Sequence, residues 1–295
     1  ERRRGAKVVT TDQRRSAVTH LRATYPVSER RACRLLRLSR SRWQHRSRRP
    51  SDAPLAEALK AKAAERPRWG YRRLAVLLRR DGLQVNLKRV LRVYRAEGLR
   101  IRKTRRRRKQ VSTPRVPRPA APGPNAQWTI DFIADQCADG RRFRVLSVVD
   151  EFTRECLALE PDVSWPSWKV AGVLDHVARA RGRPERIMLD NGPEFIAKAL
   201  DAWAYATGAA LTFSRPGKPV DNCYVESFHD KFRDECLNTH WFLDLADAQR
   251  IVPAWRQDYN MVRPHSALGG RTPSAFAAML QADAELTSAP QLTPV

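Results

Sequence analysis

Three acidic residues stand where a carboxylate could do chemistry. Asp131 interrupts the apolar sequence WTIDF, and Asp190 follows the apolar sequence RIML and precedes an Asn-Gly-Pro turn. Glu226 lies in the first turns of a predicted helix, in the sequence GKPVDNCYVESFHDKFRDEC. Two Mg²⁺ ions roughly 3.5–4 Å apart promote phosphodiester cleavage or transfer, and such hard cations need oxygen ligands. The three carboxylates could therefore be catalytic residues that bind two Mg²⁺ or Mn²⁺ ions.

Each acid also has a structural interpretation. An acid in a strand that packs on the core costs free energy unless it has a functional or structural partner. The structural alternative for Asp131 is a pair with a basic side chain. Asp190 could cap its turn, and Glu226 could be a solvated helix residue. Asp150 in the sequence VVDEF is a rival, although its place in a turn between strands favours a structural role. His229 could shuttle a proton beside Glu226, but we expect an exposed helix histidine.

The elements that must position these acids are predicted by apolar periodicity from residue 127 onward. The expected order is antiparallel strands near 127–135, 142–149 and 153–160, a helix at 166–181, a strand at 186–189, a helix at 195–206, a strand at 210–214, and helices at 221–240 and 245–261. On the helix of residues 221–240, Val225, Phe228 and Phe232 share an apolar side, so Glu226 lies away from the core. This alternation of strands and helices indicates an α/β domain.

The charge of the chain is divided between its two ends. Residues 1–126 hold 38 of the 56 Lys and Arg residues but only 8 of the 31 Asp and Glu residues, whereas residues 127–295 are mildly acidic. A polycationic segment attracts phosphate backbones by releasing counterions. The sequence therefore favours a nucleic-acid partner over a solvated basic tail or a membrane-surface patch.

Residues 69–99 have the pattern of a helix-turn-helix unit. An apolar stripe marks the first helix, Asp81-Gly82 forms a turn, and Asn86 caps a second helix whose basic side suits a DNA major groove. The alternative is a basic three-helix bundle that merely tolerates its charges. Residues 101–110 add seven basic side chains, which suit phosphate contact more than base reading. The predicted DNA contacts here are Arg72, Arg73, Lys88, Arg89, Arg92, Arg105, Arg106, Arg107 and Arg108.

Composition divides the chain into five segments. Residues 1–50 form a basic helical, helix-turn-helix-like region, and residues 51–110 a second helix-turn-helix domain. Residues 111–126 carry five prolines and are expected to be an extended linker. Residues 127–280 form the expected catalytic core, and residues 281–295 a C-terminal tail.

The five cysteines are scattered and include no C-x-x-C pair, which argues against a disulfide framework and against a Cys-rich zinc site. The chain has neither an apolar run of about 18 residues nor a signal-peptide pattern. We therefore expect a cytoplasmic protein with no membrane partner.

Several sequences in this chain together resemble one known family. Between Asp190 and Glu226 lie 35 residues, the D,D-35-E spacing of retroviral-type integrases and related transposases. In their order, WTIDF, VVDEFTRECLALE, LDNGPEF, GKPVDNCYVESFHDKFRDECLN and YNMVRPHSALGGRTPSAF closely resemble OrfB-type transposases of the IS-three family of bacterial insertion sequences. RWGYRRLAVLLRRDGLQVNLKRVLRVYRAEGL is similar to the helix-turn-helix segment of that family, so the resemblance covers nearly all of the chain.

The resemblance implies an α/β ribonuclease-H-like catalytic core, preceded by an all-α helix-turn-helix DNA-binding region. It implies that Asp131, Asp190 and Glu226 hold two Mg²⁺ or Mn²⁺ ions. In that family, water nicks the element end, and the freed 3′-OH attacks the other end or a target without a covalent enzyme intermediate. Two further contacts with DNA are expected at Lys218 and Asn222.

The family pattern gives roles to two further segments. Asn191 and Gly192 are expected to shape the loop beside Asp190. Residues 259–269, with the sequence YNMVRPHSALG, are expected to close the last helix of the core, with DNA contact as a second role. Residues 1–126 have no counterpart of the zinc-binding His/His/Cys/Cys unit of retroviral integrases, so DNA-end recognition is expected to rest on the helix-turn-helix units.

The implied partner is double-stranded DNA, as the terminal inverted repeats of an element and as target DNA. Further copies of the chain are also implied, because two DNA ends must be held together. The start at Glu1 fits a family in which a frameshift often joins an upstream-frame DNA-binding protein to this one, and the expected location is the bacterial cytoplasm, in association with the nucleoid. Two competing functions are a catalytically inert DNA-binding regulator derived from a transposase and a nuclease that does not join strands.

Overall fold

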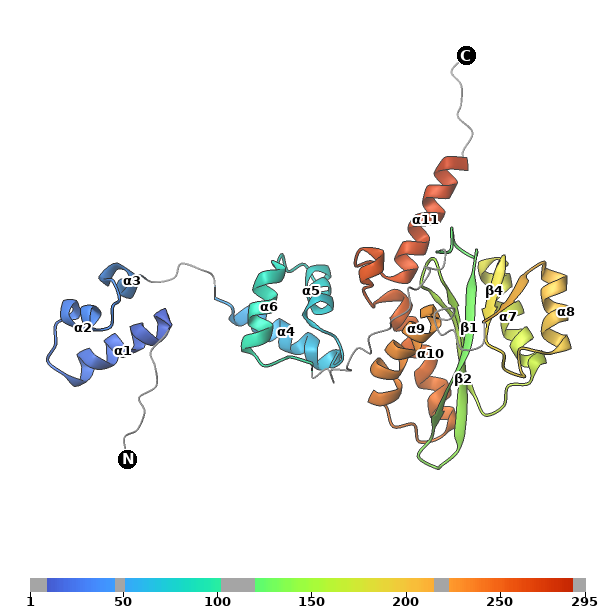
Figure 1. Cartoon of the computed structure of the whole chain (residues 1–295), viewed down its shortest axis with the longest axis horizontal. Helices are drawn as coiled ribbons and strands as arrows, with labels where there is room; N and C mark the ends of the chain where they lie inside the picture. Colours follow the sequence, from blue (N-terminus) through green and yellow to red (C-terminus); the bar gives the residue numbers. More distant parts are fainter. Residues whose placement is uncertain (1–9, 46–50, 102–119, 215–222, 289–295) are drawn as a thin grey trace, which may run out of the picture. The chain divides into compact units, whose positions relative to one another are not determined.

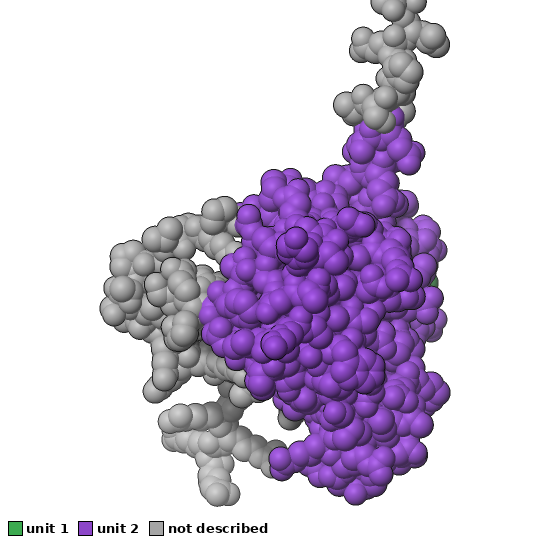
Figure 2. Space-filling view, turned by 90° about the vertical axis from the view of Figure 1, so that its right-hand side faces the viewer, with its two compact units in different colours: residues 1–54 green, residues 55–295 purple. Residues whose placement is uncertain are grey.

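The computed structural model describes residues 10–45, 51–101, 120–214 and 223–288. The chain divides into two compact units, residues 1–54 and residues 55–295, and Figure 2 shows the surface of the second unit in purple. The described residues 10–45 of unit 1 form the helices α1 (Thr11–Thr24), α2 (Glu29–Leu35) and α3 (Arg40–Gln44). A capping box between Thr10 and Gln13 begins α1, and the helices pack around Val18, Ala32 and Cys33.

The first part of unit 2 is a helical bundle of α4 (Ala53–Glu65), whose first two residues belong to unit 1, α5 (Tyr71–Arg80) and α6 (Leu87–Ala96). The turn after α5 needs a glycine, because Gly82 adopts a φ of +88°. The side chain of Asn86 accepts a hydrogen bond from the N–H of Lys88 and caps α6, as the sequence predicts. Leu74 and Leu78 of α5 are fully buried in this bundle, so the helix-turn-helix unit has its own core.

The rest of unit 2 is built on a mixed five-stranded sheet in the order β3-β2-β1-β4-β5. The strands are β1 (Trp128–Gln136), β2 (Arg142–Asp150), β3 (Cys156–Asp162), β4 (Arg186–Leu189) and β5 (Ala210–Phe213). Strands β1, β2 and β3 pair antiparallel, whereas β4 pairs parallel with β1 and β5 pairs parallel with β4.

Helices cover both faces of this sheet (Figure 1). They are α7 (Ser167–Arg181), α8 (Lys198–Thr207), α9 (Cys223–Glu235) and α10 (Leu245–Met261). The 3₁₀ turns lie at Leu237–Thr239 and Ser266–Leu268, and α11 (Pro273–Ser288) packs against α10. One face packs against α7 and α8 around Trp128, and the other packs against α9 and α10 around Phe232. The expected α/β ribonuclease-H-like class, preceded by helical bundles, is confirmed.

Element boundaries differ from the sequence prediction at several points, and the helix expected at 195–206 begins at Lys198. The third strand begins at Cys156 and not near residue 153, because the buried Asp150 carboxylate accepts the N–H groups of Phe152 and Thr153 and prolongs the turn. The long helix predicted to reach residue 240 ends at Glu235, and the 3₁₀ turn follows it. No described helix has both the length and the apolar character needed to cross a membrane.

Candidate active site

Strand pairing brings Asp131 and Asp190 to the same level of the sheet. In the parallel pair of β1 and β4, Trp128 lies opposite Ile187 and Thr129 opposite Met188. Continued by two residues, this register sets Asp131 beside Asp190, which directly follows β4. Alternation along β1 sends Ile130 to the face covered by α7 and α8, so Asp131 points to the opposite face, where α9 packs.

Helix α9 carries Glu226 to this same face. Phe228 and Phe232 bury the inner side of the helix against the sheet, and Glu226 lies exposed in the first turn. The pKa of Asp131 is raised to about 6. Burial is the main cause, the hydrogen bond from the N–H of Phe132 opposes it, and the negative charges of Asp190 and Glu226 add to it.

The donor chemistry of this trio fits a hard divalent cation. Among the described residues, neither lysine nor arginine pairs with Asp131, whose nearest basic group is the Nδ1 atom of His229, 3.7 Å from its Oδ2 atom. The like charges of three carboxylates would be relieved by a bound cation. In the described part of the chain, no group of three or more His, Cys, Asp or Glu side chains is arranged to hold a metal ion.

The loop after β4 is shaped by short contacts. The N–H of Gly192 donates to Oδ1 of Asp190 at 3.0 Å, and a Cβ atom added at Gly192 would lie 3.0 Å from the same oxygen. A side chain at this position would therefore push on the carboxylate. The amide of Asn191 donates to the carbonyl of Ser214 at 3.0 Å, which ties the loop to the end of β5.

His229 is not the exposed residue that we expected, because only 14% of its side chain is accessible. It follows Val225 by one helical turn and therefore lies on the side of α9 that faces the sheet. Its Nε2 atom lies 2.8 Å from Oγ of Ser147, which in turn donates to the carbonyl of Asp131 at 2.9 Å. Burial, followed by the charge of Arg233, lowers the pKa of His229 to about 4, so the ring is neutral at pH 7. The sequence analysis did not identify Ser147. The predicted hairpin of the first two strands could have indicated it, because Ser147 lies opposite Asp131 in that pair.

The rival Asp150 and the segment after α10 have structural contacts. Asp150 is buried, and its Oδ2 atom also accepts the N–H of Asn125 at 2.8 Å. Arg263 is buried and forms a bidentate pair with Glu235 of α9, with both distances at 2.7 Å. Burial, then the charge of Arg263, lowers the pKa of the adjacent His265 to about 3. These contacts agree with the closing role expected for residues 259–269.

The predicted DNA-binding residues lie in different surroundings. Arg72, Lys88 and Arg92 are exposed, whereas Arg89 is half-buried. Arg73 pairs with Glu235 at 2.9 Å and thus contacts the core. The other six lie outside the described residues, namely Arg105, Arg106, Arg107, Arg108, Lys218 and Asn222.

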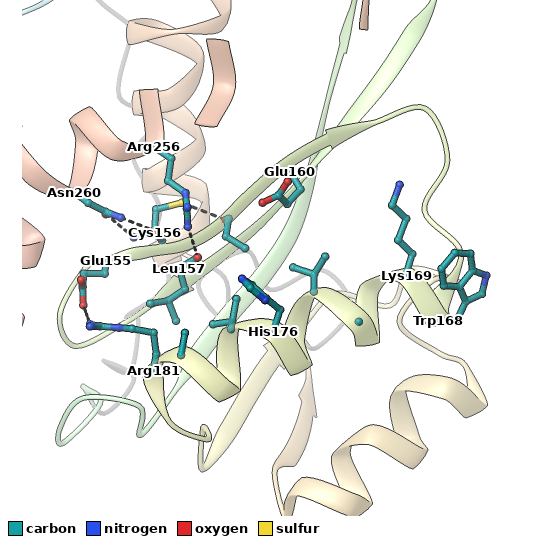
Figure 3. Close-up of a pocket in the computed structure, with 15 residues that line it drawn as sticks. Glu155, Cys156, Leu157, Glu160, Trp168, Lys169, His176, Arg181, Arg256 and Asn260 are labelled. Carbon is teal, nitrogen blue, oxygen red and sulfur yellow. Dashed lines mark hydrogen bonds and ion pairs between the residues drawn. The ribbon is translucent and has the colours of Figure 1, made fainter. Parts of the chain in front are cut away.

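A cavity of about 570 Å³ has none of the three acids in its lining, and Figure 3 shows residues that line it. It lies along the edge strand β3, between α7 and α10. The side chain of Asn260 bonds to both the N–H and the carbonyl of Cys156, and Arg256 donates to the carbonyl of Leu157 (Figure 3). Arg181 and Glu155 pair at its rim. These bonds cover the free backbone groups of an edge strand, so we assign this cavity no catalytic role.

Family models match three parts of the chain. Residues 51–109 match a model described as an HTH-like domain, and residues 121–219 and 207–273 match two models described as integrase core domains. The fold and the matches thus define a DNA integrase-type core that follows a helix-turn-helix-like domain.

Full-length relatives identify the family within this class. A 31.7 kDa protein of insertion element IS407 from Burkholderia multivorans is 47% identical, over 91% of this chain and 97% of the relative. A 39.2 kDa protein of IS476 from Xanthomonas euvesicatoria is 41% identical, over 92% of this chain and 79% of the relative. The transposase InsF for insertion sequence IS3A from Escherichia coli is 26% identical, over 83% of this chain and 92% of the relative. The chain belongs to the IS-three family of insertion-sequence transposases.

Similarity to solved structures is weaker. The catalytic core domain of HTLV-2 integrase in complex with magnesium has a TM-score of 0.40 and 16% identity, over 52% of this chain and 96% of that one. The family assignment therefore rests on the sequence relatives and the domain matches.

Proposed function

We propose that this protein is a DNA transposase that cleaves DNA strands and transfers them at the ends of an insertion sequence. One observation carries the proposal. Asp131, Asp190 and Glu226 share one face of an integrase core. Burial, together with the charges of Asp190 and Glu226, raises the pKa of Asp131, and no described lysine or arginine pairs with it. Structural carboxylates of a buried face are normally paired. Such an acid, with no described lysine or arginine as its partner and two further acids on the same face, is what a site for divalent cations needs.

The three acids would be the catalytic residues and the metal ligands. Asp131, Asp190 and Glu226 would together hold two Mg²⁺ or Mn²⁺ ions, which when bound would stabilise charge on the attacking and leaving oxygens. In cleavage, a water oxygen bonds to phosphorus as the P–O3′ bond breaks, which frees a 3′-OH. In transfer, that 3′-OH oxygen bonds to phosphorus of another strand, and a second P–O3′ bond breaks. His229 is neutral and would add no competing positive charge beside Asp131.

The basic side of α6 would contact the phosphate backbone of duplex DNA. Lys88 and Arg92 are exposed on this helix, and Arg72 is exposed on α5 with its guanidinium over the ring of Tyr71. Replacing Lys88 by Gln should weaken binding to all DNA sequences and reduce the slope of log affinity against log salt by about 0.9. A salt titration of DNA binding measures this slope, and an unchanged slope would remove Lys88 from the contact. Arg89, Arg105–Arg108, Lys218 and Asn222 are proposed as further contacts.

The proposed partners are the terminal inverted repeats of the element, target DNA and further copies of this chain. A multimer follows from the reaction, because two ends must be held together while one attacks the other. An upstream-frame DNA-binding protein, separate or fused, is a further proposed partner. The proposed location is the bacterial cytoplasm, in association with the nucleoid.

A strand-joining assay tests the proposal. The protein is incubated with DNA that carries its own element's end, with Mg²⁺ or with EDTA, and the strands are resolved on a denaturing gel. We expect a joined strand with Mg²⁺, none with EDTA, and a loss of at least about a thousandfold in Asp190→Asn. Activity that persists in Asp190→Asn would remove this residue from the site.

Two other outcomes would replace the proposal. Binding to the element end without any new strand, even with an upstream partner supplied, would favour the inert DNA-binding regulator. Hydrolysis without a joined product would favour a nuclease. Arg79→Gln is a matched control for the folding of the variant proteins, because Arg79 lies on α5 and donates within the helix-turn-helix bundle to the carbonyl of Val85.

A further inference from the structure

One carboxylate joins the helix-turn-helix bundle to the catalytic core. Glu235 stands in the last turn of α9, and only 8% of its side chain is accessible. Its Oε2 atom accepts Nε of Arg263 at 2.7 Å and Nε1 of Trp69 at 3.1 Å. Its Oε1 atom accepts Nη2 of Arg263 at 2.7 Å and Nη1 of Arg73 at 2.9 Å. Each oxygen thus has one donor from the core and one from the bundle.

Two further ion pairs flank this carboxylate. Arg66 pairs with Asp258 of α10 at 2.5 Å, and Arg68 pairs with Asp234 of α9. Basic residues before and within α5 therefore meet acids at the ends of α9 and α10. The complementary charges favour one relative placement of the two parts over others.

An apolar contact and a backbone bond extend the same surface. The side chain of Val262 packs against the core of the helix-turn-helix bundle. Arg80, in the last turn of α5, donates to the carbonyl of Val262 at 2.7 Å. The contact therefore combines buried hydrogen bonds, ion pairs and apolar packing.

We propose that Asp234, Glu235 and Asp258 form a docking surface whose partner is the helix-turn-helix bundle of the same chain. Glu235 is a positioning residue in this proposal, because it acts through the helix that also carries Glu226. The two glutamates are nine residues apart on α9, about 13 Å along the helix axis. A bundle docked at Glu235 stands at a fixed distance from Glu226.

This docking extends the proposed function and rests on it in one respect, namely that α6 binds DNA. If α6 binds DNA, the docked bundle holds that DNA in a constant register with the three acids. The contacts between α6 and DNA would thus place the scissile phosphodiester bond at the three acids before the chemical step. The docking itself does not depend on DNA or on a metal ion.

Trp69 allows a clean test of the docking surface. Its ring is buried in the core of the bundle, whereas its N–H is used at Glu235, so Trp69→Phe removes the donor and keeps an aromatic ring. Arg73→Gln removes the charge that faces Oε1. The double variant changes only the bundle side and leaves the pair of Glu235 and Arg263 in place. Arg79→Gln is the matched control on the same helix, since Arg79 bonds within the bundle.

The experiment uses the full chain with a site-specific protease sequence inserted after residue 110. The protein is folded first, then cut, and the two pieces are separated by gel filtration at micromolar concentration. We expect the wild-type pieces and the Arg79→Gln pieces to elute together. In the double variant, we expect the pieces to separate, with a dissociation constant at least tenfold higher, while circular dichroism shows both folded.

Two results would overturn the proposal. Wild-type pieces that separate while folded would show that the surface does not hold the bundle, and double-variant pieces that co-elute like wild type would remove the role of Glu235. With the uncut chain, the double variant should bind DNA as tightly as wild type and join strands at least tenfold more slowly. A wild-type protein that joins no strands would contradict the proposed function. The docking would then still be tested by the gel filtration of the two pieces.

Discussion

Asp131 and Glu235 are both largely buried carboxylates in the catalytic core, but their surroundings differ. Glu235 accepts four hydrogen bonds from Arg263, Arg73 and Trp69. Burial alone would raise the pKa of Glu235, but the hydrogen bond and charge of Arg263, with the charge of Arg73, lower it. Asp131 accepts one backbone N–H, and its pKa rises to about 6.

The difference separates a structural carboxylate from a candidate ligand. The first is neutralised by cations of the protein and holds elements together. The second stays near two other acids and destabilises the folded chain when it is ionised. Replacing each acid by its amide should therefore change the free energy of unfolding in opposite directions.

The largest effect is expected for Glu235→Gln. Arg263 has only 2% of its side chain accessible, and the substitution leaves its charge without a carboxylate partner. Breaking such a buried pair costs about 3–5 kcal/mol, and Tm should fall by roughly 10 °C. Urea unfolding measures the change, with Glu160→Gln, at an exposed position of β3, as the control. A loss below about 1 kcal/mol would mean that Glu235 is not the structural carboxylate described here.

The opposite sign is expected for Asp131→Asn. The folded pKa of about 6 lies above the ordinary value of 3.8, so the ionised carboxylate weakens folding at neutral pH. At pH 7.5 in EDTA, the variant should be more stable than wild type by about 2 kcal/mol, because the amide carries no charge and can still accept the N–H of Phe132. A destabilised variant would show that Asp131 is paired in solution.

The pH dependence sharpens the contrast. Because the pKa of Asp131 is higher in the folded chain, its contribution to the free energy of unfolding is fully present below about pH 4. This contribution is lost as the pH rises through 6 and the carboxylate ionises. The advantage of Asp131→Asn should therefore disappear at pH 4. For Glu235, whose folded pKa is lowered, the stabilisation is present above the ordinary value of 4.5 and is lost only as the pH falls through the lower folded value. The deficit of Glu235→Gln should therefore still be measurable at pH 4.5.

A smaller effect is expected from the link between α9 and the strands. Ser147→Ala removes the hydrogen bonds to the carbonyl of Asp131 and to His229, and should lower the free energy of unfolding by about 1 kcal/mol. In a double-mutant cycle with His229→Ala, the coupling should be about 0.5–1 kcal/mol. Strictly additive losses would show that the two side chains do not interact.

The sequence predicted the parts of the site that depend on local patterns. Alternation in WTIDF indicates a strand with an acid on one face, RIML indicates a short strand that ends at Asp190, and the stripe of Val225, Phe228 and Phe232 indicates which side of α9 is buried. These patterns repeat every two or 3.6 residues, so they can be read without knowledge of the fold.

The role of Glu235 could not be predicted in this way. Its partner Trp69 is 166 residues away and Arg73 is 162 residues away, so no periodicity links them. Arg73 was grouped with the DNA contacts because a basic residue on a helix-turn-helix unit has the same appearance in either role. His229 was expected to be exposed because the sequence does not show that Ser147 offers it a hydrogen-bond partner on the sheet.

The most direct test of the proposed metal ligands is a thermal unfolding experiment with Mn²⁺ on wild type, Asp131→Asn and Glu235→Gln. If the trio holds a divalent cation, Mn²⁺ at about 100 times its dissociation constant should stabilise wild type by about 2.7 kcal/mol. Glu235→Gln should gain a similar stabilisation from its lower starting Tm, and Asp131→Asn should gain almost none. An unchanged Tm of wild type, or an equal rise in all three proteins, would contradict the assignment of Asp131, Asp190 and Glu226 as the metal ligands.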